Sequence, residues 1–304
     1  MIGKKTITAV VVTYNRLQLL KRTIDCLRSQ TVALDNIIVI NNGSTDGTHE
    51  WLDSQTDLQV VHQANVGGSG GFYTGIMTAH NAAYDYVWCM DDDVFPQKNC
   101  LEKMLSFDED SIGILCPKRF VNGKPFYSEV ISLNLTNPFK HLHKVKVSDR
   151  IPQNDIPCDI VGMVFEGPLI KKCVIDKIGY PNKDLFILYD DTDYSYRAIL
   201  AGYRVLYVPT ALLDKHDFKA NKTRVEQVRN NKWKLRYHLR NTAYFCKKYG
   251  KTPIFRSFGS FQLYNRMFWA ILFNLPRNNK YCLSDLKMLI DMYNKGVKGK
   301  LGKM

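Results

Sequence analysis

The fold is decided by the stretch VWCMDDDV, residues 87–94, in which a run of apolar side chains ends in three adjacent carboxylates. Four apolar residues in succession predict a buried strand of a mostly parallel sheet. The three Asp residues need positive partners, because taking an unpaired charge out of water costs several kcal/mol. Alternate side chains of an extended chain point the same way, so Asp91 and Asp93 should share one side. Such a pair suits Mg²⁺ or Mn²⁺, which also bind substrate phosphates; for the triplet alone, a solvated acidic turn is the alternative.

Strands and helices alternate on both sides of this stretch. Strands are expected at residues 7–12, 36–40, 58–62 and 205–208, and helices at 17–30, 48–52, 72–84, 171–178 and 194–201. Such alternation with short connections is typical of an α/β fold with a mostly parallel sheet flanked by helices. Ligands of these sheets bind outside the carboxyl ends of the strands. The loops that follow strands, and that we expect along this edge, are 13–16, 41–47, 65–71 and 91–94.

A second apolar run, FILY at residues 186–189, also ends in carboxylates. A reaction that needs a base at neutral pH needs a carboxylate near the substrate that is not bound to the metal, and Asp190 or Asp191 fits this role. Asp193 fits better as a carboxylate near a helix N-terminus, where the helix dipole stabilises it. His216 follows the strand at 205–208 and adds an imidazole to the possible metal ligands.

The glycine-rich loop GGSGG at residues 67–71 precedes a predicted helix, so its backbone N–H groups could hold phosphates. It does not match the dinucleotide-binding fingerprint, which belongs in the first strand-to-helix turn, here TYNR at 13–16. The sequence also lacks a Walker A motif and an HExxH motif. Taken alone, the loop is a weak indication of phosphate binding.

The composition is that of an ordinary folded protein. The 304 residues include 45% hydrophobic and 23% charged residues, enough for one large core or for one domain with an appendage. Eight cysteines contain no CxxC pair, so neither a zinc site nor a disulfide framework is indicated, and free thiols fit a reducing, cytoplasmic setting. The apolar N-terminal run is too short for a signal peptide, and no run approaches the roughly 18 apolar residues of a membrane span.

The positive charge is concentrated at the C-terminal end. Residues 221–304 hold 19 Lys and Arg against 3 Asp and Glu, whereas residues 1–220 hold 23 against 26. The earlier part also alternates strands and helices, while the later part has helical patterns rich in basic and aromatic residues, as at 233–248 and 258–273. We therefore expect a boundary near residue 220, with an α/β catalytic domain at 1–220 and a basic helical region at 221–304.

Several motifs, taken in order, resemble those of a known enzyme family. VVVTYNR at 10–16, NNGSTDGT at 41–48, NVGG at 65–68 and DDD at 91–93 resemble the nucleotide-sugar motifs of family 2 inverting glycosyltransferases, which have the Rossmann-like GT-A fold. GSGGF at 68–72, FILYDDTDYSYR at 186–197 and the later His216 resemble the galactofuranosyltransferase branch, with rhamnosyltransferases as near neighbours. The resemblance covers about residues 1–217, and LRN at 239–241 and the closing residues 296–303 are similar to the tails of these enzymes.

The resemblance implies a role for each matching residue. Asp91 and Asp93 would hold Mn²⁺ or Mg²⁺ on the donor diphosphate with His216 as a further ligand, and Asp191 would be the catalytic base. The expected donor-binding residues are Thr13, Tyr14, Asn15, Arg16, Asn42, Asn65, Gly67, Gly68, Asp91 and Asp92. Many family members have Asp where this chain has Asn41 or Asn42. An Asn carbonyl accepts a hydrogen bond from uracil N3–H or from thymine N3–H, so the base stays open.

The expected reaction is a metal-dependent single displacement with inversion. The resemblance favours transfer of galactofuranose from UDP-galactofuranose to a hydroxyl of a surface polysaccharide or lipid-linked glycan. One alternative is a rhamnosyltransferase that uses a dTDP sugar. An alternative of another class is a module that binds sugar nucleotides or polyanions without catalysis, although a metal triad together with Asp191 argues against it.

The basic C-terminal region has three interpretations. Its cationic side chains could meet anionic lipid while aromatic residues such as Trp233, Phe268 and Trp269 lie in the interface. This interpretation places the enzyme in the cytoplasm, peripherally at the inner face of the membrane. Nucleic acid binding is the second interpretation, and the acidic first domain disfavours it. The third is a solvated helical face that packs on the catalytic domain or on a second subunit, which leaves an oligomer open.

Overall fold

The computed structural model describes residues 5–150, 156–218, 220, 224–274 and 281–304. The chain forms two compact units. The first consists of Met1–Ile131, Val145–Lys183 and Asp190–Asp217, and the second of Ser132–Lys144, Asp184–Tyr189 and Phe218–Met304. The second unit thus includes two short segments that precede residue 220, and the predicted boundary there stays a prediction.

The described residues of the first unit form a ten-stranded sheet, whose main path runs β10-β12-β6-β11-β4-β1-β2-β3. The strands are β1 (Ile7–Thr13), β2 (Asn36–Asn41), β3 (Gln59–His62), β4 (Tyr86–Asp91), β5 (Val94–Pro96), β6 (Ile112–Val121), β7 (Lys124–Phe126), β10 (Cys158–Asp159), β11 (Leu169–Lys171) and β12 (Arg204–Lys215). Strands β1 to β4 pair in parallel, as do β6 and β12, while β11 runs antiparallel between these two groups. This pairing confirms the expected α/β class with a mostly parallel sheet, because the longer strands pair in parallel.

Helices cover both faces of this sheet. They are α1 (Leu17–Arg28), α2 (Thr48–Asp53), α3 (Gly67–Asn81), α4 (Cys100–Leu105), α5 (Val147–Arg150), α6 (Lys172–Ile178) and α7 (Asp190–Leu200). Alternate residues of β1 serve the two faces: Ala9 and Val11 belong to a buried cluster with α1 and α4, and Val10 and Val12 to a second cluster with α3, α6 and α7. The continuous apolar run of β1 follows from this burial on both sides.

The glycine-rich segment is helical, which corrects its prediction as a loop. Helix α3 begins at Gly67, five residues before the expected start at Phe72. The reason is close packing on β1: a Cβ at Gly71 would lie 2.5 Å from Val12 Cγ1, and one at Gly75 would lie 2.3 Å from Val10 Cγ1. These glycines let the helix backbone approach the strand, so the glycine-rich sequence reflects helix packing more than a phosphate-binding loop.

The second apolar run, FILY, forms an irregular turn directly before α7. Phe186, Leu188 and Tyr189 have φ values of 65°, 69° and 72°, in the left-handed region that residues with a Cβ rarely adopt. Asn241 Nδ2 donates hydrogen bonds to the carbonyls of Leu185, Ile187 and Leu188 at 2.9–3.1 Å. The side chain of one distant residue therefore stabilises a backbone conformation that a run of apolar residues does not predict.

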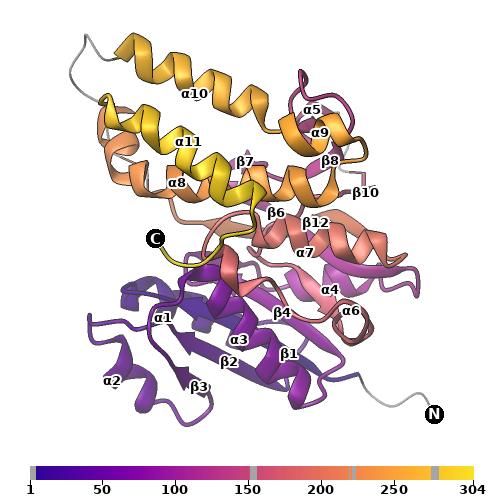
Figure 1. Cartoon of the computed structure of the whole chain (residues 1–304). Helices are drawn as coiled ribbons and strands as arrows, with labels where there is room; N and C mark the ends of the chain where they lie inside the picture. Colours follow the sequence, from indigo (N-terminus) through magenta and orange to yellow (C-terminus); the bar gives the residue numbers. More distant parts are fainter. Residues whose placement is uncertain (1–4, 151–155, 219, 221–223, 275–280) are drawn as a thin grey trace. The chain divides into compact units, whose positions relative to one another are not determined.

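The second unit is mainly helical. It contains α8 (Arg224–Tyr249), α9 (Pro253–Phe258), α10 (Phe261–Asn274) and α11 (Ser284–Val297), and Figure 1 shows α8 and α11 side by side. Its buried cluster comprises Leu239, Met267, Ile271, Met288, Leu289 and Met292. Two further strands, β8 (Val130–Leu133) and β9 (His143–Lys146), form a separate pair, and the residues of each strand are divided between the two units. Helices were expected here at 233–248 and 258–273, so α8 starts earlier than expected and α11 was missed.

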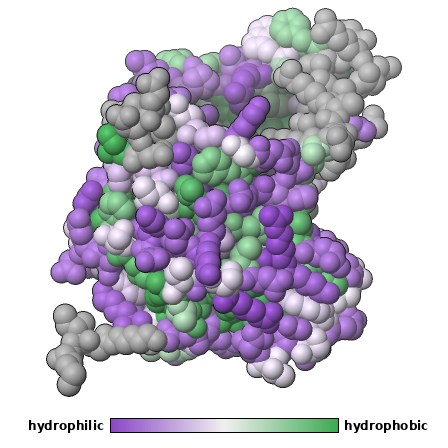
Figure 2. Space-filling model, turned by 180° about the vertical axis from the view of Figure 1, so that it is seen from behind, coloured by the Kyte–Doolittle hydropathy of each residue, from purple (hydrophilic) through white to green (hydrophobic). Residues whose placement is uncertain are grey.

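Among the described residues, every helix is too short or too polar to cross a membrane. Figure 2 shows that hydrophilic side chains cover most of one face of the molecule, with hydrophobic residues scattered in small groups between them. This distribution agrees with the charged fraction of 23% in the sequence.

Candidate active site

The parallel pairing brings the ends of β1, β2 and β4 to one edge of the sheet. Thr13 of β1 pairs with Asn41 of β2, and Val12 of β1 pairs with Asp91 of β4. The loops that follow these strands therefore start next to each other, as expected for a parallel sheet that binds ligands at its carboxyl edge.

Asp92 holds the first of these loops. Its carboxylate accepts hydrogen bonds from the Thr13 hydroxyl at 2.8 Å, from the Tyr14 N–H at 3.3 Å and from Arg16 Nη1 at 2.9 Å. Asp92 is 2% exposed, and burial is the largest cause of its raised pKa. The TYNR loop is therefore attached to the acidic triplet through Asp92, and Arg16 keeps a half-exposed guanidinium beside it.

Asp93 lies in a buried chain of alternating charges. Lys215 Nζ lies 3.0 Å and 3.1 Å from the two oxygens of Asp93 and 2.8 Å from Glu166 Oε1. The other carboxylate oxygen of Glu166 accepts a hydrogen bond from Arg119, which also donates to Glu129 at 2.8 Å. Burial alone would raise the pKa of Glu166, but Arg119 and Lys215 lower it to about 2. These residues favour the ionised form of Glu166, which is linked to Asp93 through Lys215.

Asp91 has negatively charged neighbours, chiefly Asp93 and Glu166, and the positively charged neighbour Lys215. Burial raises its pKa well above the usual range, and the neighbouring Asp93 and Glu166 raise it further, whereas Lys215 lowers it. A raised pKa means that burial and the neighbouring negative charges together disfavour the ionised form of Asp91. Carboxylate oxygens are the donors that Mg²⁺ and Mn²⁺ prefer, but those of Asp91, Asp93 and Glu166 do not all lie within 4.8 Å of one another, so a cation site here stays a prediction.

His216 lies beside Asp93 through its backbone. It follows β12 directly, and its N–H donates to the Asp93 carbonyl at 2.9 Å, while its side chain is exposed. Among the described residues, the His, Cys, Asp and Glu ligand atoms that all lie within 4.8 Å of one another are those of His49, Asp53 and His62. The side chains of Asp91, Asp93 and His216 do not meet this separation, so the role of His216 as a metal ligand stays a prediction.

The predicted base lies at the start of α7. Thr192 donates to Asp191 Oδ1 through its N–H at 2.6 Å and its hydroxyl at 3.2 Å. Burial, with a smaller effect from the neighbouring Asp190 carboxyl, raises the pKa of Asp191 to about 8, and burial raises that of Asp190 to about 6. The charge of Glu166 adds to the shift at Asp191, as it does at Asp91. The two carboxylate clusters of the sequence therefore both lie within electrostatic range of Glu166.

Asp193 lies in the first turn of α7, near the helix N-terminus. It is buried and forms an ion pair with Arg197 one helical turn later, at 2.9 Å. Arg197 also donates to the carbonyls of Ile178 and Tyr180. This carboxylate thus fixes α7 to the segment after α6.

The loops after β1 and β2 bind each other. The Asn15 N–H donates to Ser44 Oγ at 2.9 Å, the Thr45 N–H donates to Asn15 Oδ1 at 2.7 Å, and the Leu17 N–H donates to Asp46 Oδ2 at 3.0 Å. Asn15 has a positive φ of 53°, which Asn tolerates better than most residues. Tyr14 is 46% exposed, so its ring is accessible at this edge.

The side chain of Asn42 forms hydrogen bonds with other residues of the protein. Its Oδ1 accepts from Gln63 Nε2 at 3.0 Å and from the Val66 N–H at 3.2 Å, and its Nδ2 donates to the Gly67 carbonyl at 3.0 Å. Asn65 Oδ1 accepts from the Gly67 N–H at 3.0 Å. These two residues position the start of α3. A Cβ at Gly68 would have no neighbour within 4 Å, so among these positions Gly68 leaves open space at the helix start.

Sequence reasoning missed Glu166, Arg119 and Lys215. Lys215 lies next to the predicted ligand His216, yet its partner Asp93 is 122 residues away. Arg119 and Glu166 are 47 residues apart and meet because β6 lies between β11 and β12. No sequence spacing predicts these pairs. The sequence indicated them only through an Arg and a Glu that lie next to otherwise apolar strand residues.

Comparison with known proteins identifies the family. Residues 8–179, more than half of the chain, match the family model described as Glycosyl transferase family 2. Over 214 residues the chain is 25% identical to galactofuranosyltransferase GlfT1 of Mycolicibacterium smegmatis, which covers 66% of this chain and 68% of that protein. Over 213 residues it is 26% identical to poly-beta-1,6-N-acetyl-D-glucosamine synthase of Staphylococcus aureus strain COL, of which it spans about half, 48%, against 68% of this chain.

Solved structures share the fold. The S. aureus protein TarS, residues 1–349 in complex with UDP, matches with a TM-score of 0.57 at 14% identity, over 97% of this chain and 82% of that one. Mannosyltransferase PcManGT from Pyrobaculum calidifontis, in complex with GDP-Man and Mn²⁺, matches with a TM-score of 0.55 at 15% identity, over 98% and 89%. With the family match and the order of strands around the acidic triplet, these findings confirm that the chain belongs to glycosyl transferase family 2 and is a glycosyltransferase with the GT-A fold.

Proposed function

We propose that this enzyme transfers galactofuranose from UDP-galactofuranose to a hydroxyl group of a surface polysaccharide or a lipid-linked glycan. The observation that carries the proposal is that Asp91 and Asp191, two carboxyl groups with raised pKa, both lie within electrostatic range of Glu166, whose own pKa is lowered to about 2. The similarity to galactofuranosyltransferase GlfT1 supports the choice of sugar. A dTDP-rhamnose donor is the alternative, and the similarity to the poly-N-acetylglucosamine synthase adds UDP-N-acetylglucosamine to the donors worth testing.

In the proposed reaction Asp191 takes the proton of the acceptor hydroxyl as that oxygen attacks the anomeric carbon. Thr192 holds Oδ1 through two hydrogen bonds, which fixes the carboxyl plane and leaves Oδ2 to face the acceptor. A pKa near the working pH makes a carboxylate a stronger base than an exposed Asp, and it still provides the ionised form. One base without a protein nucleophile gives a single displacement, and therefore inversion at the anomeric carbon.

The donor would bind across the carboxyl edge of β1, β2 and β4. Thr13, Tyr14, Asn15 and Arg16 would line the nucleotide pocket, which Asp92 keeps in place. Asn42 and Asn65 would act through the start of α3, where Gly67 and Gly68 would lie next to the donor. Arg16 would contribute a positive charge close to the diphosphate.

A divalent cation, Mn²⁺ or Mg²⁺, would be held by Asp91 and Asp93, with Glu166 or His216 completing the protein ligands. Bound there, it would supply Lewis-acid stabilisation of the negative charge that develops on the leaving diphosphate. The protein residues would hold the diphosphate against this edge and exclude water from the anomeric carbon. Lys215 already neutralises part of the charge at Asp93 in the structure.

A donor screen with matched variants tests this proposal. UDP-galactofuranose, UDP-N-acetylglucosamine and dTDP-rhamnose would each be incubated with Mn²⁺ or Mg²⁺ and a glycan acceptor, and release of the nucleotide would be measured. We expect UDP release from UDP-galactofuranose, and about a 10²–10⁴-fold slower reaction for Asp191→Asn with donor affinity retained. The exposed Asp176, which pairs with Lys172, provides the control Asp176→Asn. If only another donor gave turnover, that donor would replace UDP-galactofuranose in the proposal. Absence of turnover with every donor would refute the proposed catalysis.

We also propose that the second unit contacts an anionic membrane surface, where a lipid-linked acceptor would be found, at the cytoplasmic side. Helix α10 exposes Phe268, Trp269, Leu272 and Phe273, which are 38–66% accessible. Trp269 stacks on Phe273 with ring centroids 5.5 Å apart, and Phe268 packs edge-on against Trp269 at 5.4 Å. The helix sequence contains Arg266 and no acidic residue, within a region that holds 19 Lys and Arg against 3 Asp and Glu. Exposed aromatic residues with surrounding positive charge suit an anionic lipid interface.

Vesicle flotation tests this contact with the full chain. Vesicles with a third of phosphatidylglycerol should carry the wild-type protein upward at low salt, and the double variant Trp269→Ser, Phe273→Ser should remain at the bottom. Ile290→Ser on α11 is the control, because Ile290 is equally exposed, at 67%, outside α10. Equal flotation of all three proteins, or none by the wild type, would contradict the proposed contact.

A further inference from the structure

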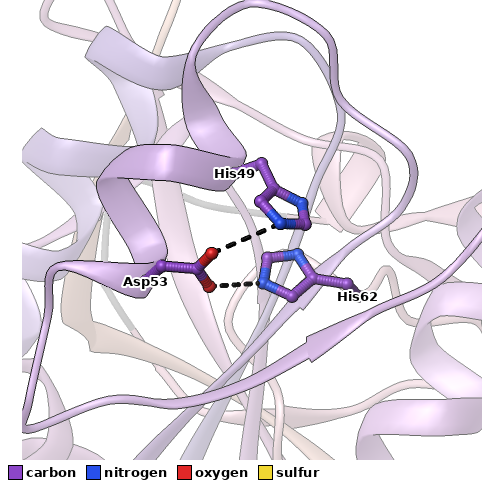
Figure 3. Close-up of side chains that lie close together, drawn as sticks. All are labelled: His49, Asp53 and His62. Atoms are coloured by element: carbon purple, nitrogen blue, oxygen red, sulfur yellow. Dashed lines mark hydrogen bonds and ion pairs between the residues drawn. The ribbon is translucent and has the colours of Figure 1, made fainter.

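Two histidines and an aspartate converge on the surface of the first unit, and neither the family motifs nor the proposed reaction uses them. His49 and Asp53 lie one turn apart on α2, and His62 ends β3. Figure 3 shows both imidazole rings directed at the same carboxylate: His49 Nε2 lies 3.3 Å from Asp53 Oδ2, and His62 Nε2 lies 3.0 Å from Asp53 Oδ1. One ligand atom of each residue lies within 4.8 Å of the other two.

The spacing suits a tetrahedral metal ion. Metal–ligand distances of about 2.0–2.2 Å place neighbouring ligand atoms of a tetrahedron roughly 3.3–3.5 Å apart. The distances from the Asp53 oxygens to His49 Nε2 and His62 Nε2, 3.3 Å and 3.0 Å, are therefore close to those between the ligand atoms of a bound metal ion. The two rings stack, with centroids 3.8 Å apart and planes inclined by 25°, so binding requires them to open until both lone pairs point at one ion. All three side chains are exposed, which leaves room for this adjustment and for a fourth, water ligand.

We propose that His49, Asp53 and His62 form a site for a zinc-class divalent cation, distinct from the oxygen-rich acidic triplet. Imidazole nitrogens favour Zn²⁺ and related transition metals, whereas Mg²⁺ takes oxygen ligands and retains its waters. The chain thus offers two sites of different chemistry. The cation on α2 and β3 takes two nitrogens, one carboxylate oxygen and a water molecule.

Binding at this site reaches Asn41 through the other nitrogen of the His62 ring. A carboxylate only accepts hydrogen bonds, so in the metal-free ring Nε2 carries the proton toward Asp53 and Nδ1 accepts from Asn41 Nδ2 at 3.0 Å. Asn41 Oδ1 in turn accepts from the Ser44 N–H at 3.0 Å. These contacts fix the tautomer of His62 and the orientation of the Asn41 amide together.

When a cation binds Nε2 of His62, the ring proton moves to Nδ1. The Nδ1–H group then faces the N–H of the Asn41 amide, and two donors cannot form a hydrogen bond with each other. Asn41 then rotates to present its oxygen to His62 and loses its hydrogen bond with Ser44. The loop after β2 therefore has two arrangements, one for the metal-free and one for the metal-bound site. A carboxylate at position 41 would accept from Nδ1–H without this conflict, and such partners of a ligating His typically change metal affinity by about 10–100-fold.

Zinc titration by calorimetry, in excess Mg²⁺ to occupy oxygen-only sites, tests the ligands. We expect one Zn²⁺ site in the full-length protein, weakened at least tenfold by His49→Ala, Asp53→Asn or His62→Ala, and strengthened about 10–100-fold by Asn41→Asp. The control is His80→Ala, because His80 also pairs with an aspartate, Asp176, at 2.7 Å. Because His49 and Asp53 are exposed, their variants should melt like the wild type. Unchanged zinc affinity in His49→Ala and His62→Ala, or a loss in His80→Ala of equal size, would overturn the site.

Nitrogen-15 NMR of the His62 ring tests the tautomer separately. Without metal, Nε2 should carry the proton; with saturating Zn²⁺, Nδ1 should carry it, and the Ser44 amide should exchange faster with solvent. An unchanged ring tautomer on zinc binding would refute the coupling to Asn41. Both measurements are independent of turnover, so a failure of the proposed transfer reaction would not alter their outcome.

Discussion

Lys215 Nζ lies 3.0 Å from one oxygen of Asp93 and 3.1 Å from the other, so an ammonium group occupies a carboxylate that the DDD motif assigns to a divalent cation. The same ammonium contacts Glu166 at 2.8 Å. Burial lowers the pKa of Lys215, but Glu166, Asp93 and Asp91 raise it above the usual value, so it is charged at neutral pH. A cation that binds Asp93 must therefore share that carboxylate with Lys215 or displace it.

Replacing Lys215 by Met should strengthen Mn²⁺ binding. A unit charge about 4 Å away at an effective dielectric constant near 20 contributes roughly 4 kcal/mol before screening, so an affinity gain of at least about tenfold is expected. Manganese affinity would be measured by electron paramagnetic resonance. Lys171→Met is the matched control, since Lys171 forms a similarly buried pair with Asp108 at 2.6 Å. Weaker Mn²⁺ binding in Lys215→Met would show instead that the ammonium helps to organise the site.

Much of the sheet followed from the sequence because it depends on local signals. Apolar runs predicted the central strands to within one or two residues, and parallel pairing then placed the triplet 91–93 beside Thr13. The contacts of Asp93 and Glu166 with Lys215 could not be predicted, because they depend on how β12 pairs with β6 and β5. The left-handed turn before Asp190 was also missed, since Asn241, more than 50 residues later, stabilises it.

The activity should rise with pH through the range in which Asp191 loses its proton. The base is active as the carboxylate, and its pKa of about 8 predicts that kcat/KM increases from pH 7 to pH 9 and then levels. Asp190→Asn removes the neighbouring carboxyl that contributes to this shift, so the rise should move to lower pH. Initial rates of nucleotide release across this range, in buffers of constant ionic strength, would measure it. A profile that stays in place in Asp190→Asn would mean that another group controls the rise.

Alanine at Gly75 should destabilise the contact between α3 and β1. The new Cβ would lie 2.3 Å from Val10 Cγ1 and 3.2 Å from Ile40 Cγ1 in the core, and overpacking of this kind costs about 1–3 kcal/mol. Gly68→Ala on the same helix has no neighbour within 4 Å and should be neutral or stabilise by up to about 1 kcal/mol. Urea unfolding would compare the two. In the proposed donor site Gly68→Ala should nevertheless raise the KM for the donor, because the methyl group fills the space next to it.

Asn241→Ala should loosen the turn that precedes the proposed base. Asn241 Nδ2 donates to the carbonyls of Ile187 and Leu188, and each buried acceptor left without a donor costs about 1–3 kcal/mol. The turn keeps residues with positive φ, which is unfavourable without these bonds, and Asp190 follows it directly. The free energy of unfolding should therefore fall by at least about 1 kcal/mol, and kcat should fall more than KM rises, because the backbone of the base is no longer fixed. Thr242→Val is the control, since its hydroxyl bonds only within the helix, to the His238 carbonyl at 2.6 Å. If Asn241→Ala lost stability with kcat unchanged, the turn would be a structural element without influence on the base.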